Sequence, residues 1–275
     1  MEGAIIKKIL NNNVVIAKEG NKEFILVGNG IGFDFHKENI VPSKRIEKVF
    51  VRENTEIDNN YDKVLETIDN KIIGISEEII CMAEMDIGVK LSKPIHVSLP
   101  DHINFSLRRM EKKIKIENPF LNELKVLYPK EYSIASKALE MINVRFNVEL
   151  PQDEIGFICL HIKAAIEESG IGTQLEYTKK IKDIMDLISN LIGRTLHKDS
   201  LEYARTLTHI NFMLERILTG KTVNNLLLDT IKDKFSKEYA IAIKLSLKIE
   251  ALFSVRVPED ETGYLAVHLK RLSDI

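Results

Sequence analysis

Two stretches of the same design, His102-Ile-Asn-Phe-Ser-Leu-Arg-Arg109 and His209-Ile-Asn-Phe-Met-Leu-Glu-Arg216, decide how this chain is organised. They lie 107 residues apart. The run from Pro151 to His161 returns from Pro258 to His268 with the same offset. Because solenoid repeats have shorter periods of roughly 20–50 residues, this spacing predicts a duplicated domain rather than a repeat array.

Both copies of the repeat carry the apolar spacing of helices. An ungapped comparison of residues 121–166 with 228–273 has 17 identities in 46 positions. From Asp62 onward, apolar residues recur at three- and four-residue intervals, which is the period of an amphipathic helix. We therefore expect two all-α helical-bundle domains, residues 62–169 and 174–275, that meet where glycines interrupt the helical pattern.

The first 52 residues have a different sequence pattern, one typical of β-strands. Short β-branched and aromatic runs at 4–10, 14–17, 24–27 and 46–50 are separated by Asn- and Gly-rich turns. This pattern predicts a small antiparallel β-sheet domain of about four strands over residues 1–55, followed by a polar linker near residues 53–61. Since so small a core is marginal, a second copy is a natural partner for its open face, and we expect a dimerising domain.

Charge is distributed unevenly along the chain. The 275 residues are 44% hydrophobic and 29% charged, with a formal net charge of −2. Residues 1–52 contain 9 basic and 6 acidic side chains, a net charge of +3, so the remainder carries −5. A polyanionic partner would therefore be met by the sheet. No apolar run is long enough to span a membrane, and the N-terminus lacks a signal-peptide core, so we expect a cytoplasmic protein without membrane insertion.

Four of the seven histidines recur at the 107-residue offset, and they are the candidate functional residues: His102, His161, His209 and His268. A purely structural role in the core is the plainest alternative, but a core position drifts among apolar types after duplication. A metal site is a poor fit because there is no His-x-x-x-His spacing and no recurring cysteine. Cys81 and Cys159 are expected to be buried free thiols. No cofactor is expected.

Catalysis fits these histidines poorly as well. No Gly-rich phosphate loop and no activated serine or cysteine is present, so we expect no catalytic residue and no enzyme. Reversible modification remains, since a ring nitrogen can accept a phosphoryl group that adds about two negative charges. Arg109 and Arg216 recur seven residues after their histidines. They are either partners for such a phosphate or simply solvated.

Several motifs together resemble a known family. They are Lys7-Lys8-Ile-Leu-Asn-Asn-Asn13, Gly28-x-Gly-Ile-Gly-Phe33, Ile46-Glu-Lys-Val-Phe50, and the four histidine motifs Asp101-His102-Ile, Leu160-His161-Ile, Thr208-His209-Ile and Val267-His268-Leu. Along its whole length the chain resembles the BglG/SacY/LicT-type transcriptional antiterminators. These have a co-antiterminator (CAT) RNA-binding domain followed by two phosphotransferase-system (PTS) regulation domains (PRDs). Asn118-Pro-Phe-Leu121 and Leu127-Tyr-Pro-Lys-Glu-Tyr132 look closest to the glucose-operon subgroup.

The resemblance implies a function. A CAT dimer would bind an antiterminator hairpin in the leader mRNA of a sugar operon and prevent the terminator from forming. The paired histidines would be phosphorylated by the histidine phosphocarrier protein or by a sugar-specific PTS permease. Which histidines take phosphate from which donor, and with what sign, does not follow from the residues.

The RNA surface is argued from chemistry and from the resemblance together. Single-stranded bases are read by amide and backbone hydrogen bonds and by aromatic stacking. The residues implied are Lys8, Asn11, Asn12, Asn13, Gly28, Asn29, Gly30 and Phe33. Asn29 departs from the basic residue that many family members carry there, and the loss of a phosphate contact is expected to weaken RNA binding and its salt dependence. Two alternatives remain: a DNA-binding activator with the same PRDs, and a phosphoryl-relay enzyme.

Overall fold

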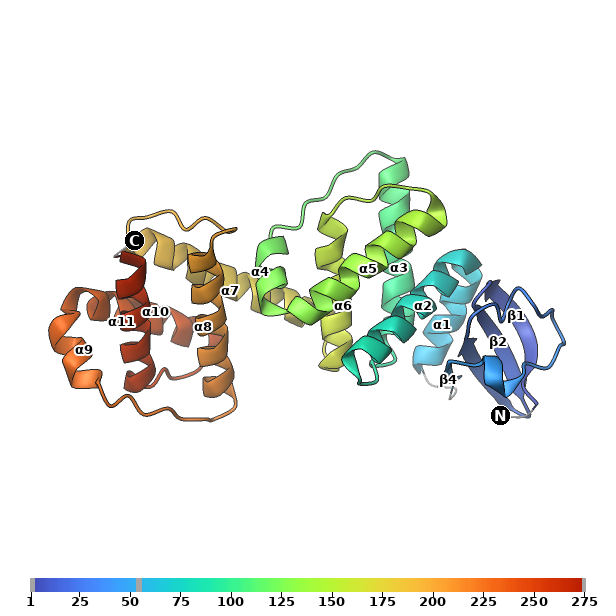
Figure 1. Ribbon diagram of the computed structural model, residues 1–275, viewed down its shortest axis with the longest axis horizontal. Helices are drawn as coiled ribbons and strands as arrows, with labels where there is room; N and C mark the ends of the chain where they lie inside the picture. Colours follow the sequence, from blue (N-terminus) through green and yellow to red (C-terminus); the bar gives the residue numbers. More distant parts are fainter. Residues whose placement is uncertain (1–2, 53–55, 274–275) are drawn as a thin grey trace. The chain divides into compact units, whose positions relative to one another are not determined.

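The structure, a computed structural model, describes residues 3–52 and 56–273 (Figure 1). Four strands come first: β1 (Ile5–Asn11), β2 (Val14–Glu19), β3 (Lys22–Val27) and β4 (Lys48–Arg52), with a short 3-10 turn at Ser43–Arg45. The helices follow in the order α1 (Glu56–Thr67), α2 (Asn70–Ile87), α3 (Ile95–Glu111), α4 (Leu121–Leu127), α5 (Pro129–Phe146), α6 (Asp153–Ile166), α7 (Ile171–Leu191), α8 (Leu201–Leu218), α9 (Leu228–Lys234), α10 (Ser236–Phe253) and α11 (Glu259–Ser273).

The strands form one antiparallel sheet in the order β1-β2-β3-β4. Val15, Ala17 and Leu26 lie in its core with Ile6 and Ile31. The predicted fold class, a small sheet followed by helical bundles, is confirmed. The register of β1 on β2 shifts between Ile6 and Lys8, so strict alternation does not hold along this strand.

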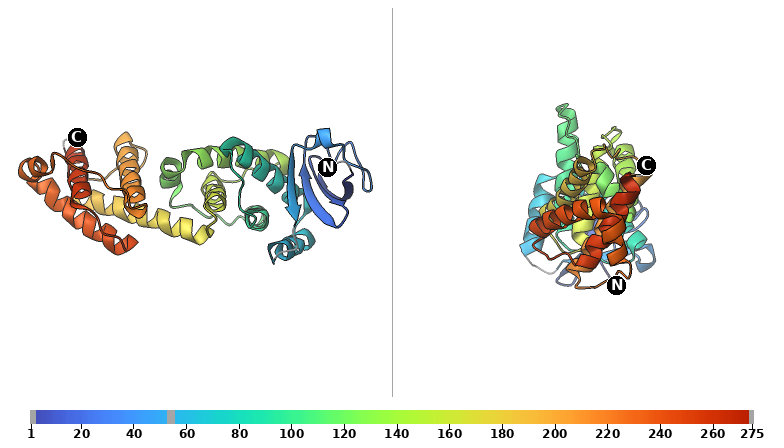
Figure 2. Two further views of the ribbon diagram at one scale, coloured as in Figure 1. Left: turned by 90° about the horizontal axis from the view of Figure 1, so that it is seen from below. Right: turned by 90° about the vertical axis from the view of Figure 1, so that its left-hand side faces the viewer.

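Helix α2 covers the opposite face of the sheet. Side chains alternate along β2, so Val14 and Ile16 point away from the core of Val15 and Ala17, yet they too are buried. α2 packs against β1, β2 and β3 (Figures 1 and 2). Within one chain, α2 therefore covers the face for which we expected a second copy.

The helices begin earlier than the apolar pattern indicated. α1 starts at Glu56, inside the segment expected to be a polar linker, while residues 53–55 of that segment lie outside the described residues. The first turn of α1 is polar in sequence, and helical periodicity can be recognised only where apolar residues recur, so the start of this helix was not predicted. The expected break between the two copies is short: α6 ends at Ile166 and α7 begins at Ile171.

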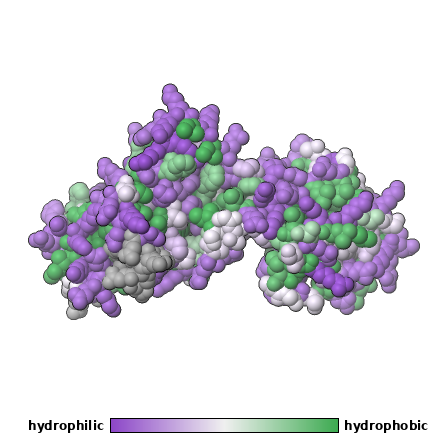
Figure 3. Space-filling view, turned by 180° about the vertical axis from the view of Figure 1, so that it is seen from behind, coloured by the Kyte–Doolittle hydropathy of each residue, from purple (hydrophilic) through white to green (hydrophobic). Residues whose placement is uncertain are grey.

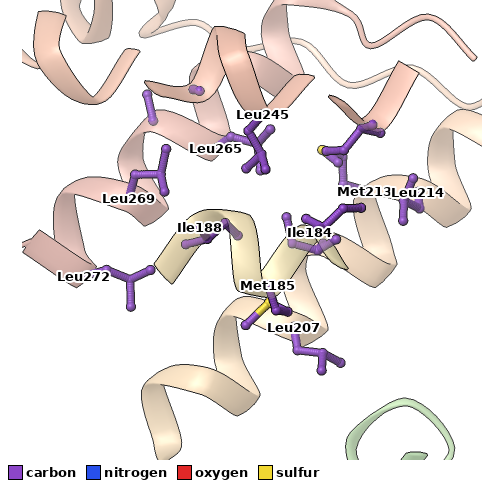
Figure 4. Close-up of a cluster of buried hydrophobic side chains, with 14 of the residues drawn as sticks. Ile184, Met185, Ile188, Leu207, Met213, Leu214, Leu245, Leu265, Leu269 and Leu272 are labelled. Carbon is purple, nitrogen blue, oxygen red and sulfur yellow. The ribbon is translucent and has the colours of Figure 1, made fainter. Parts of the chain in front are cut away.

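The chain divides into two compact units. Unit 1 comprises Met1–Pro119 and Lys130–Gln174, and unit 2 comprises Phe120–Pro129 and Leu175–Ile275. The core of unit 2 is built from α7, α8, α10 and α11, with Ile184, Leu207 and Leu265 among its buried side chains (Figure 4). Helix α4, although it belongs to the first copy in sequence, packs against α8 in unit 2.

The face shown in Figure 3 is mostly hydrophilic, with separate apolar patches. Cys81 and Cys159 are free and buried, as expected. Burial raises the pKa of the Cys81 thiol to about 11 and also raises that of Cys159. No helix in residues 3–52 and 56–273 combines the length and apolar character that crossing a membrane requires.

Candidate histidine sites and RNA-binding surface

The first histidine pair lies between α3 and α6. The ring centroids of His102 and His161 are 4.9 Å apart. Nε2 of His102 lies 3.0 Å from Oε2 of Glu154, and Nδ1 of His161 lies 3.2 Å from the Ser98 hydroxyl. Residues 59 positions apart in sequence are thus brought into one site.

The second pair lies between α8 and α11, the equivalent helices of the other copy. The ring centroids of His209 and His268 are 3.7 Å apart. Among the described residues, neither histidine has a hydrogen-bond partner for its ring nitrogens, in contrast to His102 and His161. The rings lie against each other and line a pocket of about 280 Å³ with Arg216, Glu261 and Tyr264.

Three of these histidines, His161, His209 and His268, have lowered pKa values and are unprotonated at neutral pH. Burial lowers the pKa of His161 to about 3, with a further contribution from His102. Burial, His209 and Arg271 lower the pKa of His268 to about 4. The pKa of His209 is lowered by burial and by the neighbouring charges of Arg271 and Arg216. A neutral imidazole has a free lone pair, which a nucleophilic nitrogen requires.

Each site also contains an arginine and a glutamate. Arg109 forms an ion pair with Glu154, and Arg216 binds Glu261 through Nε at 2.7 Å and Nη2 at 2.8 Å. The alternative in which both arginines are simply solvated is therefore wrong. Sequence reasoning missed the glutamates as site residues, although Glu154 and Glu261 also recur at the 107-residue offset and that signal could have found them.

A serine present in only one copy changes the glutamate's surroundings. The Ser106 hydroxyl donates to Oε2 of Glu154 at 2.8 Å, whereas Met213 occupies the equivalent position and has no such donor. Burial raises the pKa of Glu154, but hydrogen bonds from His102 and Ser106 and the charge of Arg109 outweigh it, so the pKa is lowered overall. Glu154 is therefore an anion that holds both a histidine and an arginine.

The two sites differ in their access to solvent. The Arg109 side chain is 8% exposed and that of Arg216 is 35% exposed. His161 is buried, whereas His209 is exposed and His268 is half-buried. An approaching molecule can reach the second pair more readily than the first.

Three of the predicted RNA-binding residues are exposed on the sheet domain. Phe33 is 72% exposed, and its ring can stack on a base. Asn12 and Asn29 are also exposed. The backbone N–H of Asn29 donates to Glu47 at 3.2 Å, so this loop is tied to the segment before β4.

The glycines approach the chain's own backbone. A Cβ on Gly28 would lie 1.9 Å from the carbonyl oxygen of Arg45, and one on Gly32 would lie 2.0 Å from that of Asn11. Gly30 has a φ of +70°, which favours glycine. These residues shape the loop that presents Phe33, and a close approach to RNA is not needed to explain them.

The other polar residues predicted to bind RNA, Lys8, Asn11 and Asn13, form hydrogen bonds with helices α1 and α2. Asn11 and Asn13 donate their side-chain amides to Glu78 of α2, at 2.6 and 3.0 Å. Nζ of Lys8 donates to the carbonyl oxygen of Leu65 in α1 at 3.1 Å. Lys7 pairs with Glu23 across the sheet. Glu78 is thus a third residue that sequence reasoning missed, after Glu154 and Glu261, and it does not recur at the 107-residue offset.

No group of three or more His, Cys, Asp or Glu side chains that could hold a metal ion occurs in the described part of the chain. The carboxylates of the histidine sites, Glu154 and Glu261, instead form ion pairs with Arg109 and Arg216.

Comparisons with known proteins agree with this architecture. Residues 4–59 match the CAT RNA binding domain, and residues 77–165 and 182–272 each match the PRD domain. "Transcription antiterminator LicT" of Bacillus subtilis is 35% identical over 97% of this chain and 98% of its own length. "Beta-glucoside operon antiterminator" of Dickeya chrysanthemi is 31% identical over 97% of this chain and 96% of its own.

Proteins named GlcT are similar as well. "Protein GlcT" of Staphylococcus saprophyticus is 30% identical over 98% of this chain and 97% of its own length. The solved "Crystal structure of GlcT CAT-PRDI" is 37% identical, covers 59% of this chain and 98% of that chain, and has a TM-score of 0.50.

Proposed function

Because this chain belongs to the BglG/LicT-type family of transcriptional antiterminators, with similarity to its GlcT members, we propose that its sheet domain reads leader RNA and its paired histidines receive the regulatory phosphate. The chain is an RNA-binding antiterminator controlled through its two PRD domains. The DNA-binding alternative is disfavoured, because residues 4–59 match an RNA-binding domain and form a sheet where a helix-turn-helix would lie.

The RNA partner we propose is an antiterminator hairpin in the leader mRNA of a sugar-utilisation operon. The exposed ring of Phe33 and the exposed amides of Asn12 and Asn29 support this surface, since they suit stacking and base-edge hydrogen bonds. The complete proposed set is Lys8, Asn11, Asn12, Asn13, Gly28, Asn29, Gly30 and Phe33. We place the CAT domain at residues 1–55, the first PRD at 62–169 and the second at 174–275.

The phosphate acceptors we propose are His102, His161, His209 and His268. In each transfer, a neutral ring nitrogen attacks the phosphorus of the donor's phosphohistidine, a new N–P bond forms, and the donor's N–P bond breaks. The donor imidazole leaves with the proton that the acceptor ring gives up. The lowered pKa values of His161, His209 and His268 support this role, because they keep the attacking lone pair free at neutral pH.

The two arginines are proposed to respond to phosphorylation of the neighbouring histidines. Arg109 and Arg216 are held by Glu154 and Glu261 before phosphorylation. A phosphoryl group on a neighbouring histidine offers a doubly charged bidentate partner, which an arginine favours, and places negative charge beside the glutamate. We therefore propose that phosphorylation exchanges the arginine's partner and loosens the helix pair that each glutamate joins.

The donors we propose are the histidine phosphocarrier protein and a sugar-specific PTS permease, and the active form is a homodimer in the cytoplasm. The second site is proposed to react first, since His209 is exposed and the pair lines an open pocket.

One observation carries this proposal: both copies bring two histidines, an arginine and a glutamate together with the same residue spacing. Incubating the whole chain with phosphorylated phosphocarrier protein and mapping phosphopeptides by mass spectrometry tests it. Label is expected on the four histidines and is expected to disappear when all four are changed to alanine. Label that survives the quadruple change contradicts the assignment.

The RNA assignment has a separate test. A fragment of residues 1–60 is expected to protect the leader hairpin as a dimer, with an affinity that falls steeply as salt rises. A fragment that binds duplex DNA but fails to protect leader RNA contradicts the assignment.

A further inference from the structure

Glu78 joins α2 to the proposed RNA-binding residues. Its Oε1 accepts a hydrogen bond from Nδ2 of Asn11 at 2.6 Å, and its Oε2 accepts one from Nδ2 of Asn13 at 3.0 Å. Arg145 of α5 donates to the same carboxylate at 3.1 and 3.3 Å, and the side chain of Glu78 is only 12% exposed. One carboxylate, oriented from behind by an arginine, therefore takes both amides.

The NH2 group is the only hydrogen-bond donor in the side chain of Asn11 and of Asn13. Oδ1 of Asn11 accepts the backbone N–H of Asn13 at 2.8 Å, and Oδ1 of Asn13 accepts that of Gly30 at 3.0 Å. Each carbonyl oxygen thus accepts one hydrogen bond inside the loop, and each NH2 group donates one of its two N–H bonds to Glu78. In this structure both NH2 groups are directed at Glu78.

The backbone of α2 also lies close to this loop. A Cβ placed on Gly74 would lie 2.3 Å from Nδ2 and 2.6 Å from Cγ of Asn11, so the asparagine packs where a side chain at residue 74 would be. On the same helix, Glu84 holds Lys48 of β4 at 2.5 Å. Asn11 is half-buried, and its amide lies against α2, so α2 restricts the approach of RNA to this amide.

We propose that the α2 surface around Gly74 and Glu78 is an internal binding surface for the amides of Asn11 and Asn13, and that it competes with RNA for them. This inference rests on the proposed RNA role of these asparagines. The carboxylate presents two acceptor oxygens, as a phosphate group does, and its negative charge repels an RNA backbone.

The competition has a quantitative consequence. A ligand that binds only the released state has its affinity reduced by the fraction of molecules in that state. Hydrogen bonds to a charged group are stronger than neutral ones, so weakening the two that Glu78 accepts from the asparagines raises the released fraction. Because Arg145 orients Glu78 from α5, a rearrangement of the helical domain changes the access of RNA to the sheet.

The test measures RNA affinity on the whole chain. The probe is a fluorescent RNA hairpin selected from a random-sequence library on the wild-type chain, with a scrambled loop as the reference. Glu78→Ala removes the acceptor, and Gly74→Ala keeps the helix but displaces Asn11. Both variants are expected to lower the dissociation constant by about tenfold or more. Gly74→Ala also favours the helix, so it keeps the test decisive if Glu78→Ala fails to fold.

The matched control is Asp86→Asn, which removes one negative charge from α2 at a residue that pairs with Lys137 and not with the sheet. It is expected to leave the dissociation constant within about twofold of wild type, and an equal gain there would overturn the inference. Phe33→Ala distinguishes failure of the proposed competition from failure of the proposed RNA-binding surface. Unchanged affinity in both α2 variants, in a chain that loses binding with Phe33→Ala, overturns the competition but not RNA binding. Unchanged affinity with Phe33→Ala overturns the RNA surface and this inference with it.

Discussion

Glu154 and Glu261 occupy equivalent positions, but burial makes their ion pairs unequal. Arg109, the partner of Glu154, is 8% exposed, whereas Arg216, the partner of Glu261, is 35% exposed. Both glutamates are buried, so removing either one leaves its arginine unpaired: Arg109 is then a buried uncompensated charge, whereas the charge of Arg216 is screened by water. The two copies therefore provide a matched comparison at single residues.

Changing each glutamate to glutamine tests this difference. Glu154→Gln is expected to lower the free energy of unfolding of its domain by about 3–5 kcal/mol. Glu261→Gln is expected to lower it by about 1 kcal/mol or less. Calorimetric unfolding of the whole chain resolves the two changes. Equal losses of unfolding free energy in the two variants contradict the difference in burial between Arg109 and Arg216.

The buried histidine of the first site predicts a dependence of stability on pH. The pKa of His161 in the folded chain is about 3, below its usual value of 6.5. Between these two values the unfolded chain binds the proton and the folded chain does not. The stabilising contribution is therefore complete above about pH 6.5 and is lost as the pH falls toward 3, at up to about 1.4 kcal/mol per pH unit.

Measuring urea unfolding from pH 7.5 to 5 in wild type and in His161→Leu checks this expectation. The slope of stability against pH is expected to be shallower in the variant. His36→Leu, at an exposed histidine of the sheet domain, is the control. A slope that His161→Leu leaves unchanged contradicts the neutral, buried state of this ring.

At the level of elements, α4 and α9 are equivalent by sequence but differ in their packing. α9 packs against α10 and α11 of its own copy, whereas α4 packs against α8 of the other copy, in unit 2. The buried Glu123 of α4 accepts a hydrogen bond from the Tyr203 hydroxyl at 2.5 Å. Burial and Glu123 raise the pKa of Tyr203, so the hydroxyl stays protonated as the donor. Duplication thus produced two like helices with different partners.

Removing that hydroxyl measures how firmly α4 is held. Tyr203→Phe leaves the buried Oε1 of Glu123 with only the Lys198 ammonium, at 3.4 Å, and is expected to cost about 1–3 kcal/mol of unfolding free energy. The comparison is Tyr239→Phe, which removes an exposed hydrogen bond to Glu259 and is expected to change stability little. If both variants melt at the wild-type temperature, the hydrogen bond between Tyr203 and Glu123 of α4 contributes nothing to stability.

At the scale of the whole molecule, the two histidine sites differ in accessibility although their residues are alike. His209 and His268 line an open pocket, whereas His161 is buried against Ser98. In the phosphorylation proposed above, the first site must open before a donor reaches it, and each 1.4 kcal/mol of opening free energy slows the proposed transfer about tenfold.

Time-resolved phosphopeptide mapping of the whole chain is the measurement. Label is expected on the second pair before the first, by a factor of about ten or more. Ser98→Ala, which removes the partner of His161, is expected to narrow this gap. Simultaneous labelling of both pairs contradicts the order.

The architecture followed from the sequence because it depends on local periodicity. Runs of β-branched residues between turns predicted each strand of the sheet, and three- and four-residue apolar spacing predicted helices in both copies. α1 was placed too late because its first turn is polar. α2 was expected as a helix, but nothing in its apolar spacing indicated that it would cover a sheet.

The sequence by itself determined that the domain is duplicated, that a basic sheet precedes it and that four histidines recur in register. These are properties of order along the chain. Only the tertiary structure decided that Glu154 holds Arg109, that Glu78 holds Asn11, and that one histidine site is buried and the other open. These contacts join residues 45 and 67 positions apart, and no local pattern specifies them. They arise when packed helices bring distant side chains together and exclude water, which sets both their partners and their charge.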